Sequence, residues 1–102
     1  MQAAHRIPTD AERAAFEARL VREGYPDTLV RTLEPNVVIE RHTHPYDVLA
    51  LVLAGEATID CGAGPVTYRP GDVLELAADV PHTEHYGPDG YTFLVGRRHK
   101  PA

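Results

Sequence analysis

The chain lacks serine entirely and has one lysine, Lys100, among its 102 residues. The first absence excludes a Ser-His-Asp hydrolase, and the second disfavours Schiff-base chemistry, which needs a lysine inside the fold. The single cysteine, Cys61, permits neither an internal disulfide nor a Cys-x-x-Cys zinc site. Because Cys61 ends a predicted strand, we expect it to be a small buried hydrophobe. Any chemistry must therefore use a metal ion, carboxylates, histidines or tyrosines.

Long hydrophobic runs and an excess of positive charge are also missing. The longest apolar run, residues 48–54, is too short to cross a bilayer, and residues 1–10 lack the apolar core of a signal peptide. We therefore predict a cytoplasmic protein with no membrane partner. The net charge is −5, and the one basic cluster, residues 97–100, lies at the terminus, where we expect it to keep the tail solvated. This charge distribution argues against a nucleic-acid partner.

The length allows one domain with one modest core. After a polar leader, Thr9 and Glu12 form a capping-box pattern that predicts a helix over residues 11–23, ending at Gly24. We interpret this helix as a packing element without a functional site. The predicted organisation is a leader and helix at 1–27, a β-barrel domain at 28–97 and a tail at 98–102.

The rest of the chain consists of short β segments separated by turn residues such as the Pro-Gly pair at 70–71. Strands at this regular spacing predict an all-β sandwich or small barrel. The predicted strands are 28–34, 37–43, 48–54, 56–61, 66–69, 73–76, 82–86 and 91–97.

The segment 48–54 is apolar at every position, which indicates that both of its faces are covered. If its smaller side chains line a barrel interior, then Leu49, Leu51 and Leu53 point outwards and need a partner. The N-terminal helix looks short for that task. We therefore predict a homodimer that buries this leucine row.

Four of the six histidines lie between residues 42 and 85. In an extended strand, His42 and His44 project from the same face, close enough for both imidazoles to reach one metal ion. A third ligand should come from a distant strand, and His82 is the candidate. The ordinary role of a single histidine is a solvated or hydrogen-bonded residue, but the His-x-His pair entering a strand favours a metal site.

These residues resemble the cupin family, whose members are jelly-roll β-barrels that carry a metal on two histidine motifs. His42, His44 and Gly55 fit the first motif, with Asn36 in place of its first glycine. Asn also visits the left-handed region, so this change is tolerable. Gly71 and His82 fit the second motif. There, the motif's Pro, Gly and Asn are replaced by Ala77, Asp79 and Tyr86. The resemblance covers about residues 28–97 and implies one jelly-roll barrel. The short N-terminal helix predicted above lies outside it.

One departure concerns the metal shell. The glutamate of the first motif falls at Val48, which cannot bind a metal, so the resemblance implies three histidine ligands and at least one open position. Asp47 is one residue early; it becomes a fourth ligand if Pro45 turns the segment inward, and is otherwise a surface or strand-end carboxylate. Three-histidine cupins without this glutamate include metal-dependent dioxygenases of small thiols and diketones.

Glu84 and Tyr86 alternate with His82 and so share its face, whereas His85 should point outwards. Glu84 can support a ligand, act as general base, complete the metal shell or serve only solubility. Tyr86 is a candidate proton donor, although core tyrosines commonly just pack and hydrogen bond. Arg41 and Arg69 are candidates to bind a substrate carboxylate at the rim or plain surface charges.

The sequence thus predicts a cupin that binds one divalent metal ion, Fe, Zn, Ni or Mn, and acts on a small organic substrate as a dioxygenase or as a Lewis-acid lyase or isomerase. A small cavity would be lined by Val38, Ala50, Val52 and Ile59. The alternatives are a non-catalytic binding or sensory barrel and a barrel without metal.

Overall fold

One helix followed by six strands makes up the protein in a computed structural model that describes residues 6–99. The helix, α1, spans Asp10–Arg22 and begins with the predicted capping box between Thr9 and Glu12. The strands are β1 (Asp27–Leu33), β2 (Val38–His42), β3 (Tyr46–Asp60), β4 (Pro65–Tyr68), β5 (Val73–Leu76) and β6 (His82–His99). The prediction of a mostly β fold with one short helix is confirmed. Within residues 6–99, no helix has the length and apolar character needed to cross a membrane.

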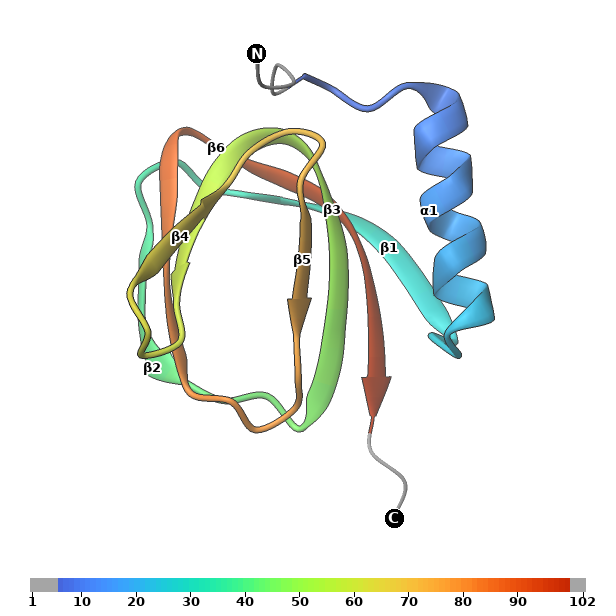
Figure 1. Cartoon of the computed structure of the whole chain (residues 1–102). Coiled ribbons are helices and arrows are strands. Elements are labelled where there is room, and N and C mark those ends of the chain that lie inside the picture. Colours follow the sequence, from blue (N-terminus) through green and yellow to red (C-terminus); the bar gives the residue numbers. More distant parts are fainter. Residues whose placement is uncertain (1–5, 100–102) are drawn as a thin grey trace.

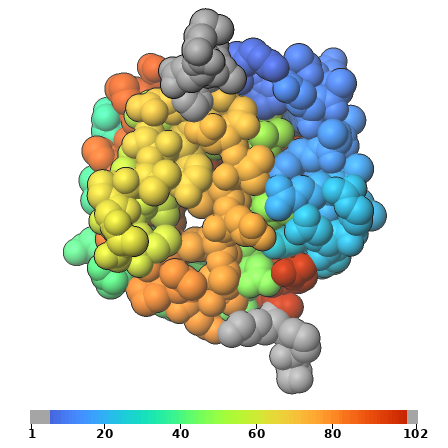
Figure 2. All heavy atoms as spheres, in the orientation of Figure 1, coloured from blue at the N-terminus to red at the C-terminus, as the bar shows by residue number. Residues whose placement is uncertain are grey.

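The antiparallel pair of β3 and β6 forms the centre of a six-stranded sheet. β1 and β2 pair with β6, whereas β4 and β5 pair with β3, and the strands curve around a common interior (Figure 1). In the described part of the chain, these pairings do not close into a ring, and the surface is open between β4 and β5 (Figure 2). The sheet therefore supports the predicted jelly-roll barrel only in part.

β3 and β6 are each longer than the sequence predicted. The segments 48–54 and 56–61 belong to one strand, as do 82–86 and 91–97. Gly55, with φ of 70°, does not end β3; the register instead shifts between Gly55 and Ala57. A Cβ at Gly55 would collide with the backbone oxygen of Gly90, so the two strands approach closely at this shift. Gly55 and Gly90 therefore lie within the strand pair, which continues past them with a shift in register.

The expectation that α1 cannot cover the leucine row was wrong. Leu49, Leu51 and Leu53 do face outwards, but they form a buried cluster with Phe16 and Leu20 of α1. Tyr25 and Leu94 complete this cluster. Figure 1 shows α1 lying against the outside of the sheet. The row therefore needs no second copy to remove it from water, and the homodimer stays a prediction without this support.

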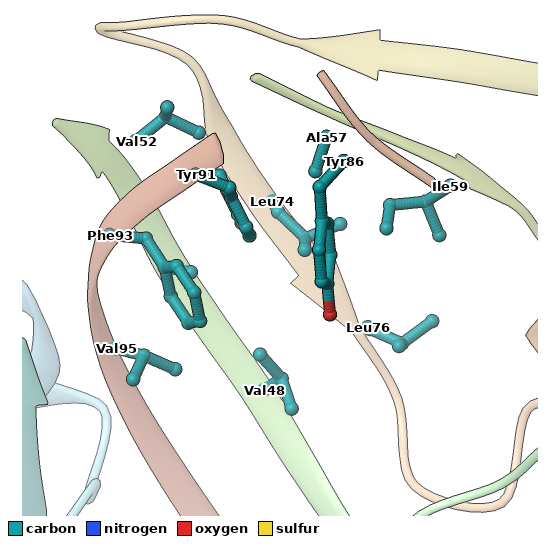
Figure 3. Packing of buried hydrophobic residues seen from close by; sticks show 11 residues of the cluster. Val48, Val52, Ala57, Ile59, Leu74, Leu76, Tyr86, Tyr91, Phe93 and Val95 are labelled. Carbon is teal, nitrogen blue, oxygen red and sulfur yellow. The ribbon is translucent and has the colours of Figure 1, made fainter. Parts of the chain in front are cut away.

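The interior of the curved sheet holds a second apolar cluster, which Figure 3 shows. Ala50, Val52 and Ile59 lie in it as predicted, but Val38 is 65% exposed. The cause is a register shift between Ile39 and His42: three steps along β2 match two steps along β6. The extra residue reverses the alternation of faces, so that Ile39 packs against the interior in place of Val38.

Two expectations for exposed segments also change. Cys61 is exposed in the turn after β3, so it is not the small buried hydrophobe that the sequence suggested. β6 continues to His99, into the segment predicted as a tail. Arg98 does not simply keep that segment solvated: it donates to Asp47 Oδ2 at 2.9 Å and to the backbone oxygen of Glu23. Lys100 lies outside the described residues.

Candidate metal centre

Three histidines from two distant parts of the chain meet at one end of the interior. His42 ends β2 and is paired in register with His82, the first residue of β6. His44 lies beyond β2, in the loop to β3, in agreement with the predicted strands, which end at residue 43 and resume at 48. The backbone N–H of Asp79 donates to the backbone oxygen of His44 at 2.8 Å, which ties this loop to the segment that precedes His82.

The imidazoles turn their Nε2 atoms toward one another. His42 Nε2 lies 3.1 Å from His44 Nε2, and the ring centroids of His42 and His82 are 4.3 Å apart. His82 is 1% exposed, whereas His42 and His44 are half-buried. The three histidines that the sequence proposed as ligands therefore lie together in the structure.

Backbone carbonyls fix the orientation of two of these rings. His42 Nδ1 lies 2.7 Å from the backbone oxygen of Glu40, and His82 Nδ1 lies 3.0 Å from that of Val80. A carbonyl oxygen only accepts, so in each case Nδ1 carries the proton. In a neutral imidazole this leaves Nε2 with an available lone pair, the state that binds a metal.

The surroundings of His44 favour its neutral form. Burial lowers the pKa of His44, and the nearby His82 and His42 lower it further. Its ring stacks on Tyr46 at a centroid distance of 4.9 Å. Its Nδ1 is buried without a hydrogen-bond partner in the described chain. Because the neutral imidazole is the ligand form, this environment favours metal binding over protonation.

Glu84 completes the cluster. Its Oε2 lies 3.2 Å from both His42 Nε2 and His82 Nε2, and its Oε1 accepts from the Tyr86 hydroxyl at 2.9 Å. Burial and the neighbouring Glu84 raise the pKa of Tyr86, so the phenol stays protonated and acts as a donor. Tyr86 projects into the apolar cluster of the interior (Figure 3).

The four side chains suit a divalent metal. One possible ligand atom from each of His42, His44, His82 and Glu84 lies within 4.8 Å of the others. With Nδ1 protonated, the Nε2 atoms of His42 and His82 and the Glu84 carboxylate are all acceptors, and acceptors repel at 3.2 Å unless a proton or a cation lies among them. Three imidazoles and one carboxylate match the preferences of zinc, iron and nickel.

The structure does not bring Asp47 to this group. The carboxylate of Asp47 accepts from the Ala78 backbone N–H at 2.8 Å and pairs with Arg98, so Pro45 does not turn it toward the histidines. The carboxylate beside the imidazoles, which the sequence suggested could be Asp47, is instead that of Glu84, two residues after His82. Arg41 is exposed outside the cavity lining, and Arg69 lies 3.5 Å from Glu56.

A cavity of about 430 Å³ adjoins the histidines, and Glu84 and Tyr86 line it too. Its walls are mainly apolar, as expected for a small-molecule site. Sequence reasoning missed Arg31, Tyr91 and Arg97 in this lining. Arg97 shares the inward face of β6 with Phe93 and Val95, so alternation from those buried residues was the signal that could have found it.

The curved sheet with its outer helix and two histidine segments is a small fold of the cupin type, and residues 29–86 match the family described as Cupin domain. The chain therefore belongs to the cupin family. Comparison with curated protein sequences found no match.

Solved structures with a similar fold include DMSP lyase DddQ from Ruegeria pomeroyi DSS-3, with 26% sequence identity and a TM-score of 0.63. The match covers 72% of this chain but only 38% of the lyase, so this chain spans well under half of that protein's length. KdgF from Halomonas sp. has 18% identity and a TM-score of 0.57, over 74% of this chain and 73% of KdgF. An RmlC-like cupin from Shewanella frigidimarina NCIMB 400 has 15% identity and a TM-score of 0.60, over 72% and 65% of the two chains. The last two show the fold alone.

Proposed function

We propose that the protein binds one divalent metal ion through His42, His44, His82 and Glu84 and acts as an enzyme on a small organic molecule in the adjoining cavity. The observation that carries this proposal is the convergence of three Nε2 atoms and a Glu84 carboxylate oxygen, with neighbouring atoms 3.1–3.2 Å apart. Such a group of acceptors is stabilised by a cation among them.

Proton transfer of the lyase or isomerase type is the chemistry that these side chains support best. A bound metal supplies a Lewis acid that polarises the substrate. Glu84 can act as the base when the three histidines hold the metal and Oε2 is free: Oε2 then takes the proton, while the Tyr86 hydroxyl holds the other carboxylate oxygen. Because the pKa of Tyr86 is raised, its hydroxyl stabilises the ionised carboxylate as a donor and does not compete as a base. The similarity to a DMSP lyase supports this class, whereas a dioxygenase would require iron at the same site.

The test is elemental analysis of untagged protein purified without chelator, comparing wild type with His42→Ala and His85→Ala. His85 is an exposed histidine of β6 outside the four-residue group, so His85→Ala is the matched control. We expect near-stoichiometric metal in wild type and His85→Ala, and its loss from His42→Ala with the circular dichroism spectrum retained.

The other outcomes separate the alternatives. Metal content unchanged by His42→Ala contradicts the ligand assignment, and unfolding of His42→Ala indicates a structural metal. A wild type that takes up no ion when each is offered at neutral pH supports a plain ligand-binding barrel. Iron directs substrate screens to oxygen consumption, whereas zinc, nickel or manganese directs them to lyase and isomerase substrates.

A further inference from the structure

Two arginines line the apolar cavity from neighbouring strands. Arg31 of β1 is paired in register with Phe93 of β6, and both residues line the cavity. Arg97 lies further along β6 on the same face as Phe93, because alternate residues of a strand share a face. Both arginines therefore project from the same wall of the cavity, the one formed by β1 and β6, which also carries Phe93.

Neither of these arginines forms an ion pair with a carboxylate within residues 6–99. Arg97 Cζ lies 5.2 Å from the centroid of the Tyr46 ring, a cation–π contact that leaves its N–H groups able to donate. Asp27 is opposite Arg97 in the register of β1 and β6, but the two side chains form no ion pair. In contrast, Arg69 and Arg98 outside the cavity lining each have a carboxylate within 4 Å.

A bound metal ion would change the net charge of the cavity and therefore the charge of the ligand that the cavity favours. In formal charge, Arg31 and Arg97 match the two carboxylates of the lining, Glu34 and Glu84. A divalent ion would therefore leave the cavity with an excess of positive charge, and a cavity with apolar walls concentrates that field. An anionic ligand is favoured over a neutral or cationic one.

A buried hydroxyl adds a further donor to the same wall. Tyr91 is 3% exposed and lines the cavity between Tyr86 and Phe93, with ring centroids 5.6 and 4.3 Å from theirs. Its hydroxyl is buried and has no hydrogen-bond partner among the described residues. A buried donor without a partner is costly, and a ligand that accepts from it removes that cost.

We propose that the substrate is a small organic carboxylate, held through its carboxylate by Arg31 and Arg97 with its apolar body against the walls of the cavity. This inference rests on the proposed function, since it names the substrate class of the same site. Arg31 and Arg97 are substrate-binding residues, and they replace Arg41 and Arg69, which the sequence suggested for this role.

Isothermal titration calorimetry with hexanoate and its neutral counterpart hexanamide tests this inference, on both zinc-loaded and metal-free protein. We expect hexanoate to bind more tightly than hexanamide, and Arg31→Gln and Arg97→Gln each to weaken hexanoate binding about 10-fold, the usual effect of a charge-assisted hydrogen bond. Arg41→Gln is the matched control, because Arg41 is exposed as Arg31 is but lies outside the cavity lining, and it should bind as wild type does. Circular dichroism establishes that each variant is folded.

The outcomes keep the two proposals apart. Equal binding of hexanoate and hexanamide, or Gln variants that bind hexanoate as Arg41→Gln does, overturns the carboxylate inference even if the protein binds zinc. Loss of hexanoate binding in both Gln variants with zinc content unchanged supports it. If no metal binds but the Gln variants still lose hexanoate, the carboxylate site holds and the metal-dependent function fails.

Discussion

At the scale of single residues, two non-glycine residues that stand where the cupin motifs have glycine adopt a positive φ. Asn36 has φ of 60° and Asp79 has φ of 65°. In this conformation the backbone N–H of each residue joins two segments around the site. Asn36 N–H donates to Gly87 O at 3.1 Å, and Asp79 N–H donates to His44 O. Asn and Asp tolerate the left-handed region better than other L-residues, so the motif geometry survives these changes.

The cost of the left-handed conformation at Asn36 is measurable. Asn36→Ala places a residue with a poor tolerance for positive φ there, so we expect the free energy of unfolding to fall by about 1–2 kcal/mol. Asn36→Gly is the matched control, because glycine adopts this φ without strain, and it should be more stable than Asn36→Ala. Urea denaturation measures both. Equal stabilities of the two variants would show that φ at residue 36 does not limit the fold.

Residue patterns in the sequence predicted most of the candidate site. His82, Glu84 and Tyr86 share a face because the first residues of β6 are regular, so alternation gave their positions correctly. Alternation failed at β2, where the bulge between Ile39 and His42 turns Val38 outwards. A bulge depends on how two strands pair, and no pattern within β2 alone reveals it.

At the scale of elements, the close contact between α1 and the outer face of the sheet depends on Gly96. This residue is paired in register with Leu49, and a Cβ at position 96 would lie 2.7 Å from Leu20 Cδ2 and 3.0 Å from Tyr25 Cβ. The absence of a side chain therefore lets the helix and the segment after it close over the leucine row. The sequence showed the narrow Phe16–Leu20 stripe of the helix but not this partner surface, because the fit depends on an absent side chain in a strand far along the chain.

A double-mutant cycle tests this contact. Gly96→Ala adds one methyl group against Leu20, so we expect it to lower the free energy of unfolding by about 1–3 kcal/mol. Leu20→Ala alone should cost about 2–5 kcal/mol through the cavity it leaves. In the Leu20→Ala background the added methyl has room, so the cost of Gly96→Ala should shrink. Strictly additive losses in urea denaturation would mean that Leu20 does not set the limit at position 96.

At the scale of the whole molecule, α1 and the curved sheet enclose two apolar clusters on opposite faces of β3. Val48, Ala50 and Val52 face the interior, while Leu49 and Leu51 face α1, which explains why every position of this segment is apolar. The sequence predicted the two covered faces correctly. The sequence analysis wrongly expected a second copy of the chain, and not α1, to cover the leucine face, because the length of a helix does not reveal how much area it buries.

A Leu51→Ala variant should therefore lower the stability of the protein without changing its oligomeric state. We still propose a homodimer, with a solution mass of twice 11.2 kDa by light scattering at micromolar concentration. A stable interface buries about 800 Å² per partner, and the exposed apolar residues of β1, Leu29 and Val30, are available for it. Because α1 already buries Leu51, Leu51→Ala should lower the free energy of unfolding by about 2–5 kcal/mol and leave the mass unchanged. Dissociation of a dimer by Leu51→Ala would instead mean that the leucine row is the subunit interface and that α1 moves away from it, whereas a monomeric wild type would contradict the dimer itself.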